Sequence, residues 1–175
     1  MAEELSTPLV KSAIIAAGYA AITILIAPIA YGPYQFRISD VLMPIPYLPY
    51  FGISGIIGIT VGTLIANLIS PYSFWDVILG TLANLISGTG SYLAWRMPNK
   101  TIGKLIAVVI PVVVVTVLIG YVLLHAIFGV PFWVAISGIL ISETVTAGIG
   151  GYIFITRLEK VLGSTVVQDA NQNRS

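Results

Sequence analysis

The sequence predicts an all-α membrane protein with six transmembrane helices, and three observations support this fold class. Hydrophobic residues make up 57% of the 175 residues and charged residues only 9%, whereas soluble domains usually carry about 25% charge. The apolar residues gather in runs long enough to cross a bilayer. With six crossings counted from a cytoplasmic N-terminus, seven of the eight basic residues fall inside, which predicts that both termini are cytoplasmic. Those seven are Lys11, Arg96, Lys100, Lys104, Arg157, Lys160 and Arg174.

Six apolar runs define the expected helices. The first, 10–30, is rich in alanine, and the second, 38–51, is short and contains three prolines. The third covers 52–69, and the fourth covers 74–95 with Asp76 in its first turn. The fifth covers 105–128, and the sixth, 131–158, carries Glu143 near its middle. We therefore expect one transmembrane domain over residues 1–163, followed by a polar, disordered tail over 164–175.

The second run needs a special explanation because it is too short for a straight crossing. As a helix, 38–51 rises only about 21 Å, against a hydrocarbon core of about 30 Å. A re-entrant segment would explain this length, but it would move the basic loop 96–104 outside and remove the charge bias. We therefore keep six crossings and expect a bent backbone covered by protein. Such a segment draws Arg37 and Asp40 below the outer surface.

Several polar residues in the apolar chain require partners or a function. Arg37 and Asp40 lie three residues apart and are expensive to bury unless they are paired or used. Asp76 is suited either to capping the fourth helix through its dipole or to contacting a ligand or Arg37. Asn67 lies one turn before Pro71, so it either binds freed backbone groups or lines a site.

Glu143 and Asn84 lie deeper within predicted helices. An ionisable group at the middle of a membrane helix indicates a functional site by default. The alternative for Glu143 is a buried, protonated or hydrogen-bonded structural residue beside Ser142 and Thr144. Asn84 belongs to a small polar face of the fourth helix, where helix packing is the alternative to ligand contact.

Three aromatic residues near the predicted outer surface have two interpretations. Trp75 and Trp133 suit an interfacial aromatic belt, and they are also placed to cover a flat ligand. His125, near the outer end of the fifth helix, is either a satisfied polar side chain or a ligand contact.

Small residues form two rows on the first helix. Ala13, Ala17 and Ala21 make one row, and Ser12, Ala16 and Ala20 make the other. Such rows let another helix approach closely. The partner is either a helix of the same chain or a separate protein that docks on Ala13, Ala16, Ala17, Ala20 and Ala21.

Several function classes are disfavoured by what the sequence lacks. It has no cysteine, one histidine and a net charge of +1, so we expect neither a metal site nor nucleic-acid binding. It has no phosphate-binding loop of the ATPase type and no catalytic constellation. We therefore expect a protein that is not an enzyme and has no cofactor.

The stretch 34–80 contains a series of short motifs: Gln35-Phe36-Arg37-Ile38-Ser39-Asp40, the proline-rich stretch through Pro49, Gly55, Gly62, Ala66-Asn67, Ser70-Pro71, Trp75-Asp76 and Gly80. In these motifs the stretch resembles the QueT family. At position 40 we expect Glu more often than Asp, but the carboxylate is kept.

The resemblance implies the substrate-binding S component of an energy-coupling-factor (ECF) transporter in the cell membrane. Its implied ligands are queuosine precursors, the 7-deazaguanines such as preQ1, preQ0 or queuine. It further implies six helices, both termini inside, a site opening outward, and alanine rows that dock a membrane-embedded coupling subunit, which works with two ATPase subunits.

The ligand chemistry suggests roles for the candidate residues. A 7-deazaguanine presents two neighbouring N–H donors, which a carboxylate of Glu143 or Asp40 can accept. Asn84 or Asn67 can serve O6, and Asp76 or Asp40 can neutralise an aminomethyl cation. Arg37 is expected to orient Asp40. The alternatives are an S component for another vitamin or purine, and a stand-alone proton-coupled permease with Glu143 as proton carrier.

Overall fold

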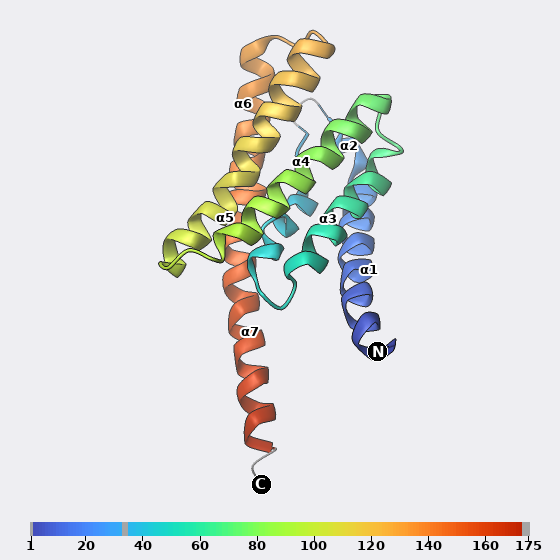
Figure 1. Cartoon of the computed structure of the whole chain (residues 1–175). Helices are drawn as coiled ribbons and strands as arrows, with labels where there is room; N and C mark the ends of the chain where they lie inside the picture. Colours follow the sequence, from blue (N-terminus) through green and yellow to red (C-terminus); the bar gives the residue numbers. More distant parts are fainter. Residues whose placement is uncertain (1, 33–34, 173–175) are drawn as a thin grey trace.

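The computed structural model describes residues 2–32 and 35–172, and these residues form helices and turns without a β-strand (Figure 1). Four of the helical stretches are long and apolar enough to cross a membrane. They correspond to the first, fourth, fifth and sixth predicted helices, which confirms a multi-pass, all-helical membrane protein. These stretches are Thr7–Leu25, Phe74–Ala94, Lys100–Ile127 and Phe132–Gly163.

Each long stretch belongs to one or more labelled elements. The first lies in α1 (Ala2–Leu25), which the short α2 (Ala27–Ala30) follows, and the second lies in α4 (Ser73–Ala94). The third joins α5 (Lys100–Val115) to the wider turns of η3 (Thr116–Ile127). The fourth joins α6 (Phe132–Glu143), η4 (Thr144–Gly150) and α7 (Gly151–Gln172). Between α2 and α4 lies α3 (Gly52–Asn67), which is apolar but only 16 residues long.

The prediction of a single helix over 38–51 is wrong. The chain there forms two short 3₁₀ helices, η1 (Ile38–Leu42) and η2 (Ile45–Tyr47). The reason is local, because Pro44, Pro46 and Pro49 lack N–H donors and disfavour α conformation in the residues before them. The segment is largely buried, as expected for irregular backbone that protein must cover.

Close packing of α1 on α3 depends on glycine. A Cβ atom added at Gly58 would lie 2.6 Å from Ile15 Cβ, and one added at Gly62 would lie 2.8 Å from the Ala16 carbonyl oxygen. Ala16 and Ala20 are buried, whereas Ala13, Ala17 and Ala21 are exposed. The row that contains Ala16 and Ala20 therefore packs inside the molecule. Of the two rows, only Ala13, Ala17 and Ala21 stay available for docking a separate protein.

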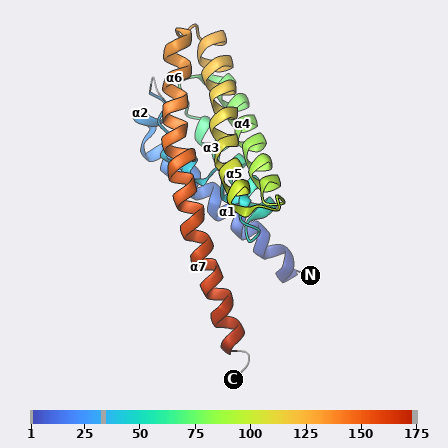
Figure 2. The same cartoon turned by 90° about the vertical axis from the view of Figure 1, so that its left-hand side faces the viewer.

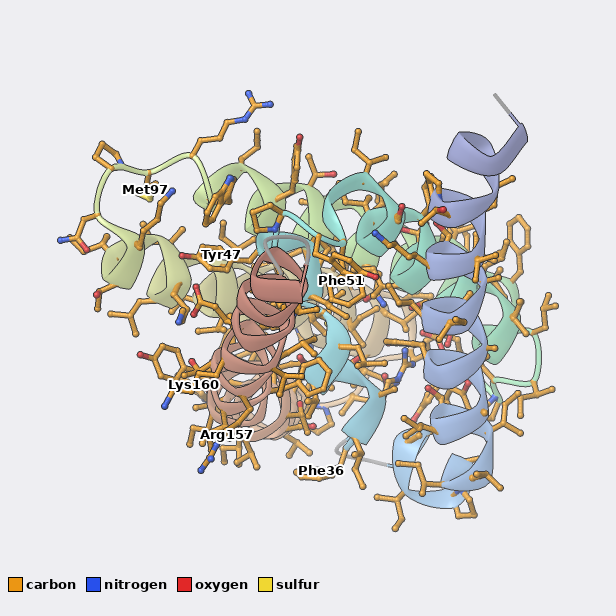
Figure 3. All side chains as sticks on the ribbon, turned by 90° about the horizontal axis from the view of Figure 1, so that it is seen from below. Phe36, Tyr47, Phe51, Met97, Arg157 and Lys160 are labelled. Carbon is orange, nitrogen blue, oxygen red and sulfur yellow. The ribbon has the colours of Figure 1, made fainter. Side chains whose placement is uncertain are left out.

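The start of α1 and the end of α7 point to the same end of the bundle, toward which the connection from α4 to α5 also lies (Figure 1). Figure 2 shows α7 extending past the other helices there. In the view from below, Arg157 and Lys160 lie on α7, and Met97 marks the α4–α5 connection (Figure 3). Lys104 forms an ion pair with Glu159 at 2.5 Å, which ties α5 to α7. The helix of α7 enters the predicted tail 164–175, of which residues 173–175 lie outside the described residues.

Candidate ligand-binding site

A buried ion pair lies between the segment that precedes η1 and the first turn of α4. Arg37 Nη2 lies 3.2 Å from Asp76 Oδ2, and the two residues are 5% and 0% exposed. Arg37 also donates to the side-chain oxygen of Gln35 at 3.1 Å and lies over the ring of Tyr31. Pairing is what makes these charges tolerable away from water. Asp76 therefore contacts Arg37, one of the two roles considered for it.

Asn67 joins α3 to α4 beside this ion pair. Its Nδ2 donates to the backbone oxygen of Asp76 at 2.9 Å, and the Tyr31 hydroxyl donates to the neighbouring Ala66 carbonyl at 2.6 Å. Gly80 makes space for the side-chain amide of Asn67, because a Cβ atom at position 80 would collide with Asn67 Nδ2. The amide N–H of Asn67 is thus engaged in bracing the two helices.

A second cluster of buried polar side chains contains Asp40, from η1, and Glu143, the last residue of α6. The carboxyl groups of Asp40 and Glu143 lie beside each other, and the two residues are 2% and 1% exposed. The hydroxyl of Tyr19, from the middle of α1, donates a short hydrogen bond to Asp40 Oδ1. Three elements distant in sequence therefore meet at one carboxyl pair. The positive charge of Arg37 is near enough to affect Asp40, but Arg37 forms its ion pair with Asp76.

Two buried polar atoms at this place have no hydrogen-bond partner. They are Gln35 Nε2, a donor, and Glu143 Oε2, an acceptor. The two residues are held near each other because Ser142 Oγ donates to the Gln35 carbonyl at 3.2 Å. Gln35 also has a φ of +41°, a left-handed conformation that residues other than glycine rarely adopt. Unsatisfied buried groups and local strain are both typical of functional sites.

Asn84 reaches the same network from α4. Its Nδ2 makes a short hydrogen bond to Thr63 Oγ1 on α3, and Asn84 is 3% exposed. Thr63 donates to the Ile59 carbonyl oxygen at 2.8 Å and lies near the Tyr19 hydroxyl. Polar side chains therefore follow one another from Asn84 through Thr63 and Tyr19 to Asp40, and one N–H of Asn84 is used within the protein.

The remaining three candidates lie apart from this cluster. His125 Nδ1 is 2.9 Å from the Val130 carbonyl oxygen, so its polar atom is satisfied locally. Trp75 is 49% exposed and Trp133 is 78% exposed. Each stacks edge-on against its preceding phenylalanine. Their exposure agrees with the interfacial interpretation rather than with a ring that covers the buried carboxyls.

The sequence alone did not point to Tyr19, Tyr31 or Thr63 as site residues, and it placed Gln35 in the polar segment of the site without a specific contact. A signal was available for Tyr19, because a hydroxyl in the middle of an apolar membrane helix needs a buried partner. Gln35 was visible as a polar neighbour of Arg37, but its unpartnered amide nitrogen follows only from the tertiary contacts.

A hollow of about 540 Å³ adjoins the cluster. It is lined by Phe36, next to Gln35, and by Ser142, next to Glu143. Gly138 also lines the hollow, together with the exposed Ser137 and Ile141. The hollow therefore lies beside the two residues that carry the unpartnered polar atoms.

The amino-acid sequence is similar to one known protein family. A family model described as QueT transporter matches residues 9–160. The chain is also similar to the queuosine precursor transporter QueT of Lactococcus lactis subsp. cremoris (strain MG1363), with 38% identity over 80 residues. That match covers 45% of each of the two chains. No solved structure matches the chain.

Proposed function

We propose that this chain, which belongs to the QueT transporter family, is the membrane subunit that binds queuosine precursors, the 7-deazaguanines, for import. The relative from Lactococcus lactis is named for the transport of such precursors. The observation that carries the ligand assignment is the pair of buried, unpartnered atoms, Gln35 Nε2 and Glu143 Oε2. A ligand for this pair must present an acceptor beside a donor.

A 7-deazaguanine has this pattern along one edge. Its O6 is an acceptor, and the neighbouring N1–H and N2–H₂ are donors. In this proposal Gln35 Nε2 donates to O6, and the Glu143 carboxyl accepts from the ring donors. Hydrogen bonds to the buried Glu143 carboxyl would strongly favour 7-deazaguanines over analogues that lack the N1–H and N2–H₂ donors. Such an analogue would leave buried polar groups of the protein unpaired.

The other polar residues support this recognition pair. Asn67 and Asn84 were alternatives for O6, but their amide nitrogens already donate to Asp76 and Thr63. Gln35 therefore takes the O6 role in the proposal. Arg37 holds Gln35 in place by donating to its side-chain oxygen, which turns the amide nitrogen away from Arg37.

Equilibrium binding to the purified protein tests this assignment. Glu143→Gln and Gln35→Met should each weaken the binding of 7-aminomethyl-7-deazaguanine by about 10- to 100-fold, because each removes one half of the edge recognition. Glu159→Gln is the matched control, since Glu159 is an exposed carboxylate paired with Lys104. If both site variants bind like the parent protein, the assignment of the site is wrong.

The proposal extends to transport by an ECF-type importer in the cell membrane. The four long helices, α3 and the bent segment 38–51 make six crossings with both termini in the cytoplasm. A coupling subunit and two ATPase subunits supply the energy, and the exposed row Ala13, Ala17 and Ala21 docks the coupling subunit.

Docking on the exposed row has a direct test. Ala17→Trp should reduce co-purification with the coupling subunit and leave ligand affinity unchanged. Val113→Trp, at an exposed position of α5, should change neither property. Unchanged assembly with Ala17→Trp would remove this row from the interface.

A second candidate function is favoured by the Asp40–Glu143 carboxyl pair. Buried carboxyl groups in membrane proteins commonly relay protons, so a stand-alone proton-coupled permease would use the same residues. Uptake into proteoliposomes that contain only this chain, driven by a pH gradient, would support the permease. Uptake only with ATPase partners would support the ECF-type importer. Mass spectrometry of co-purified small molecules separates 7-deazaguanines from another vitamin or purine.

A further inference from the structure

An apolar groove lies between α5 and the helical stretch formed by η4 and α7, apart from the candidate ligand-binding site. We name it the α5–α7 groove, and it encloses about 390 Å³. A Cβ atom added at Gly148 would lie 3.6 Å from Val112 Cγ2, so a larger side chain at position 148 would occupy this space. The residues that form most of its wall are Leu105, Val109, Val112, Gly148, Ile149 and Ile153.

The α5–α7 groove runs along the helices rather than across them. On α5 it extends from Val112 to Leu105, which is about 10 Å of helix. Leu105 is the end nearer the α4–α5 connection, because α5 begins at Lys100. An apolar groove that is parallel to membrane-spanning helices has the shape and the polarity to hold the hydrocarbon chain of a lipid.

Basic side chains border the groove at this end. Lys104 directly precedes Leu105 in α5. Arg157 follows Ile153 by four residues, so it lies on the same face of α7, one turn nearer the end of the bundle. Lys160 lies three residues further along that face, and both Arg157 and Lys160 are exposed. Their side chains project from the same side of α7 (Figure 3).

Arg157 and Lys160 differ from the other basic side chains at this end of the bundle in what they contact. Within the part of the chain whose side chains are described, neither forms an ion pair, and the nearby carboxylate of Glu159 is already paired with Lys104. Two positive charges therefore stay unbalanced at the end of the groove. The basic residues that do have a described partner are Lys11, Arg96, Lys100 and Lys104.

We propose that the α5–α7 groove binds a phospholipid with an anionic headgroup. One acyl chain lies in the groove, and Arg157 and Lys160 hold the phosphate, for which the guanidinium offers paired donors. The cytoplasmic leaflet carries anionic lipids, and basic pockets between membrane helices on that side bind their headgroups. The proposal uses the cytoplasmic orientation proposed above for this end of the bundle, and it does not depend on the transported ligand.

Basic residues at a cytoplasmic end are also expected from topology alone. Topology sets only the number of charges on that side. It does not require that the two unbalanced charges lie at the end of an apolar groove. The test must therefore separate the position of the charges from their number.

Two lipids with the same acyl chains test the headgroup. Native mass spectrometry of the purified full chain in a nonionic detergent follows titration with dioleoyl-phosphatidylglycerol and with dioleoyl-phosphatidylcholine. We expect the anionic lipid to bind at least about tenfold more tightly to the parent protein. Arg157→Gln combined with Lys160→Gln should weaken its binding by about 10- to 30-fold and leave phosphatidylcholine unaffected. Arg96→Gln combined with Lys100→Gln removes the same charge from the same end and should change the affinity by less than about threefold.

A bulky side chain tests the groove itself. Val109→Trp, at an exposed position of the groove wall, should weaken the binding of both lipids because the indole takes the place of the acyl chain. Ile86→Trp, at an exposed position of α4 outside the groove, is the matched control and should change neither affinity.

Several results would overturn the lipid site. These are equal affinity of the parent protein for the two lipids, an equal loss in the two charge variants, and unchanged lipid binding by Val109→Trp. Displacement of phosphatidylglycerol by glycerol 1-phosphate would show that a free phosphate suffices and that the groove has no part in binding. Weaker assembly of Val109→Trp with the coupling subunit, with lipid binding unchanged, would assign the groove to a protein partner.

The outcome is independent of the proposed function. Each variant should bind 7-aminomethyl-7-deazaguanine as the parent protein does, because the changed positions lie outside the candidate ligand-binding site. A parent protein that selects the anionic lipid but binds no 7-deazaguanine would overturn the proposed function and support the lipid site. A parent protein that binds the 7-deazaguanine but does not distinguish the lipids would do the reverse.

Discussion

At the scale of single residues, the site follows from the rule that polar atoms in a membrane protein must find partners inside the protein. Arg37, Asp76 and Asn67 satisfy one another almost completely. Gln35 and Glu143 do not, because each keeps one buried polar atom without a partner. The contrast separates residues that brace the site from residues that are free to recognise a ligand.

Tyr19 gives a test at this scale. Tyr19→Phe keeps the ring but removes the hydroxyl that donates to Asp40. We expect a loss of about 1–2 kcal/mol in unfolding free energy and about tenfold weaker ligand binding, because Asp40 loses a buried partner. Thermal unfolding in detergent and equilibrium binding measure the two effects. Tyr121→Phe is the control, since Tyr121 is 48% exposed. Equal behaviour of the two variants would show that the Tyr19 hydroxyl has no special role.

At the scale of elements, proline and glycine control how the helices are arranged. The prolines of 38–51 replace a straight helix with two 3₁₀ turns, and this bent chain carries Asp40 into the interior. The glycines of α3 let α1 approach closely enough for Tyr19 to reach Asp40. The prolines and glycines of these elements could be identified from the sequence, but the contact between Tyr19 and Asp40 could not.

Glycine in α3 can be tested directly. Gly62→Ala places a Cβ atom 2.8 Å from both the Ala16 carbonyl oxygen and Tyr19 Cβ, so α1 must shift. We expect destabilisation of about 1–3 kcal/mol together with weaker ligand binding, because Tyr19 moves with α1. Gly18→Ala is the matched control on α1, where an added Cβ meets nothing within 4 Å. A Gly62→Ala variant as stable as Gly18→Ala would contradict the tight α1–α3 contact.

At the scale of the whole molecule, the number of crossings decides which end of the bundle faces the cytoplasm. The basic α4–α5 connection lies at the same end as the start of α1 and the end of α7 (Figure 1). This agrees with the charge distribution predicted from the sequence. Our proposal of six crossings requires that the bent segment 38–51 be one of them, although it is not a regular helix.

The topology can be measured because the chain contains no cysteine. Single cysteines at Pro98 and Phe128, both exposed positions, serve as probes in intact cells. An impermeant thiol reagent should label Phe128→Cys and leave Pro98→Cys unlabelled until the cells are opened. The reverse pattern would contradict six crossings with a cytoplasmic N-terminus.

The sequence by itself determined that this is a helical membrane protein, that 38–51 differs from an ordinary span, and that Arg37, Asp40, Asp76 and Glu143 need partners. These conclusions depend on composition and spacing along the chain. Only the tertiary structure decided that Arg37 pairs with Asp76, that Tyr19 reaches Asp40, and that Ala13, Ala17 and Ala21 stay exposed. Such choices depend on how each helix is rotated and how closely it crosses its neighbours, and these quantities are set by contacts between residues far apart in the chain.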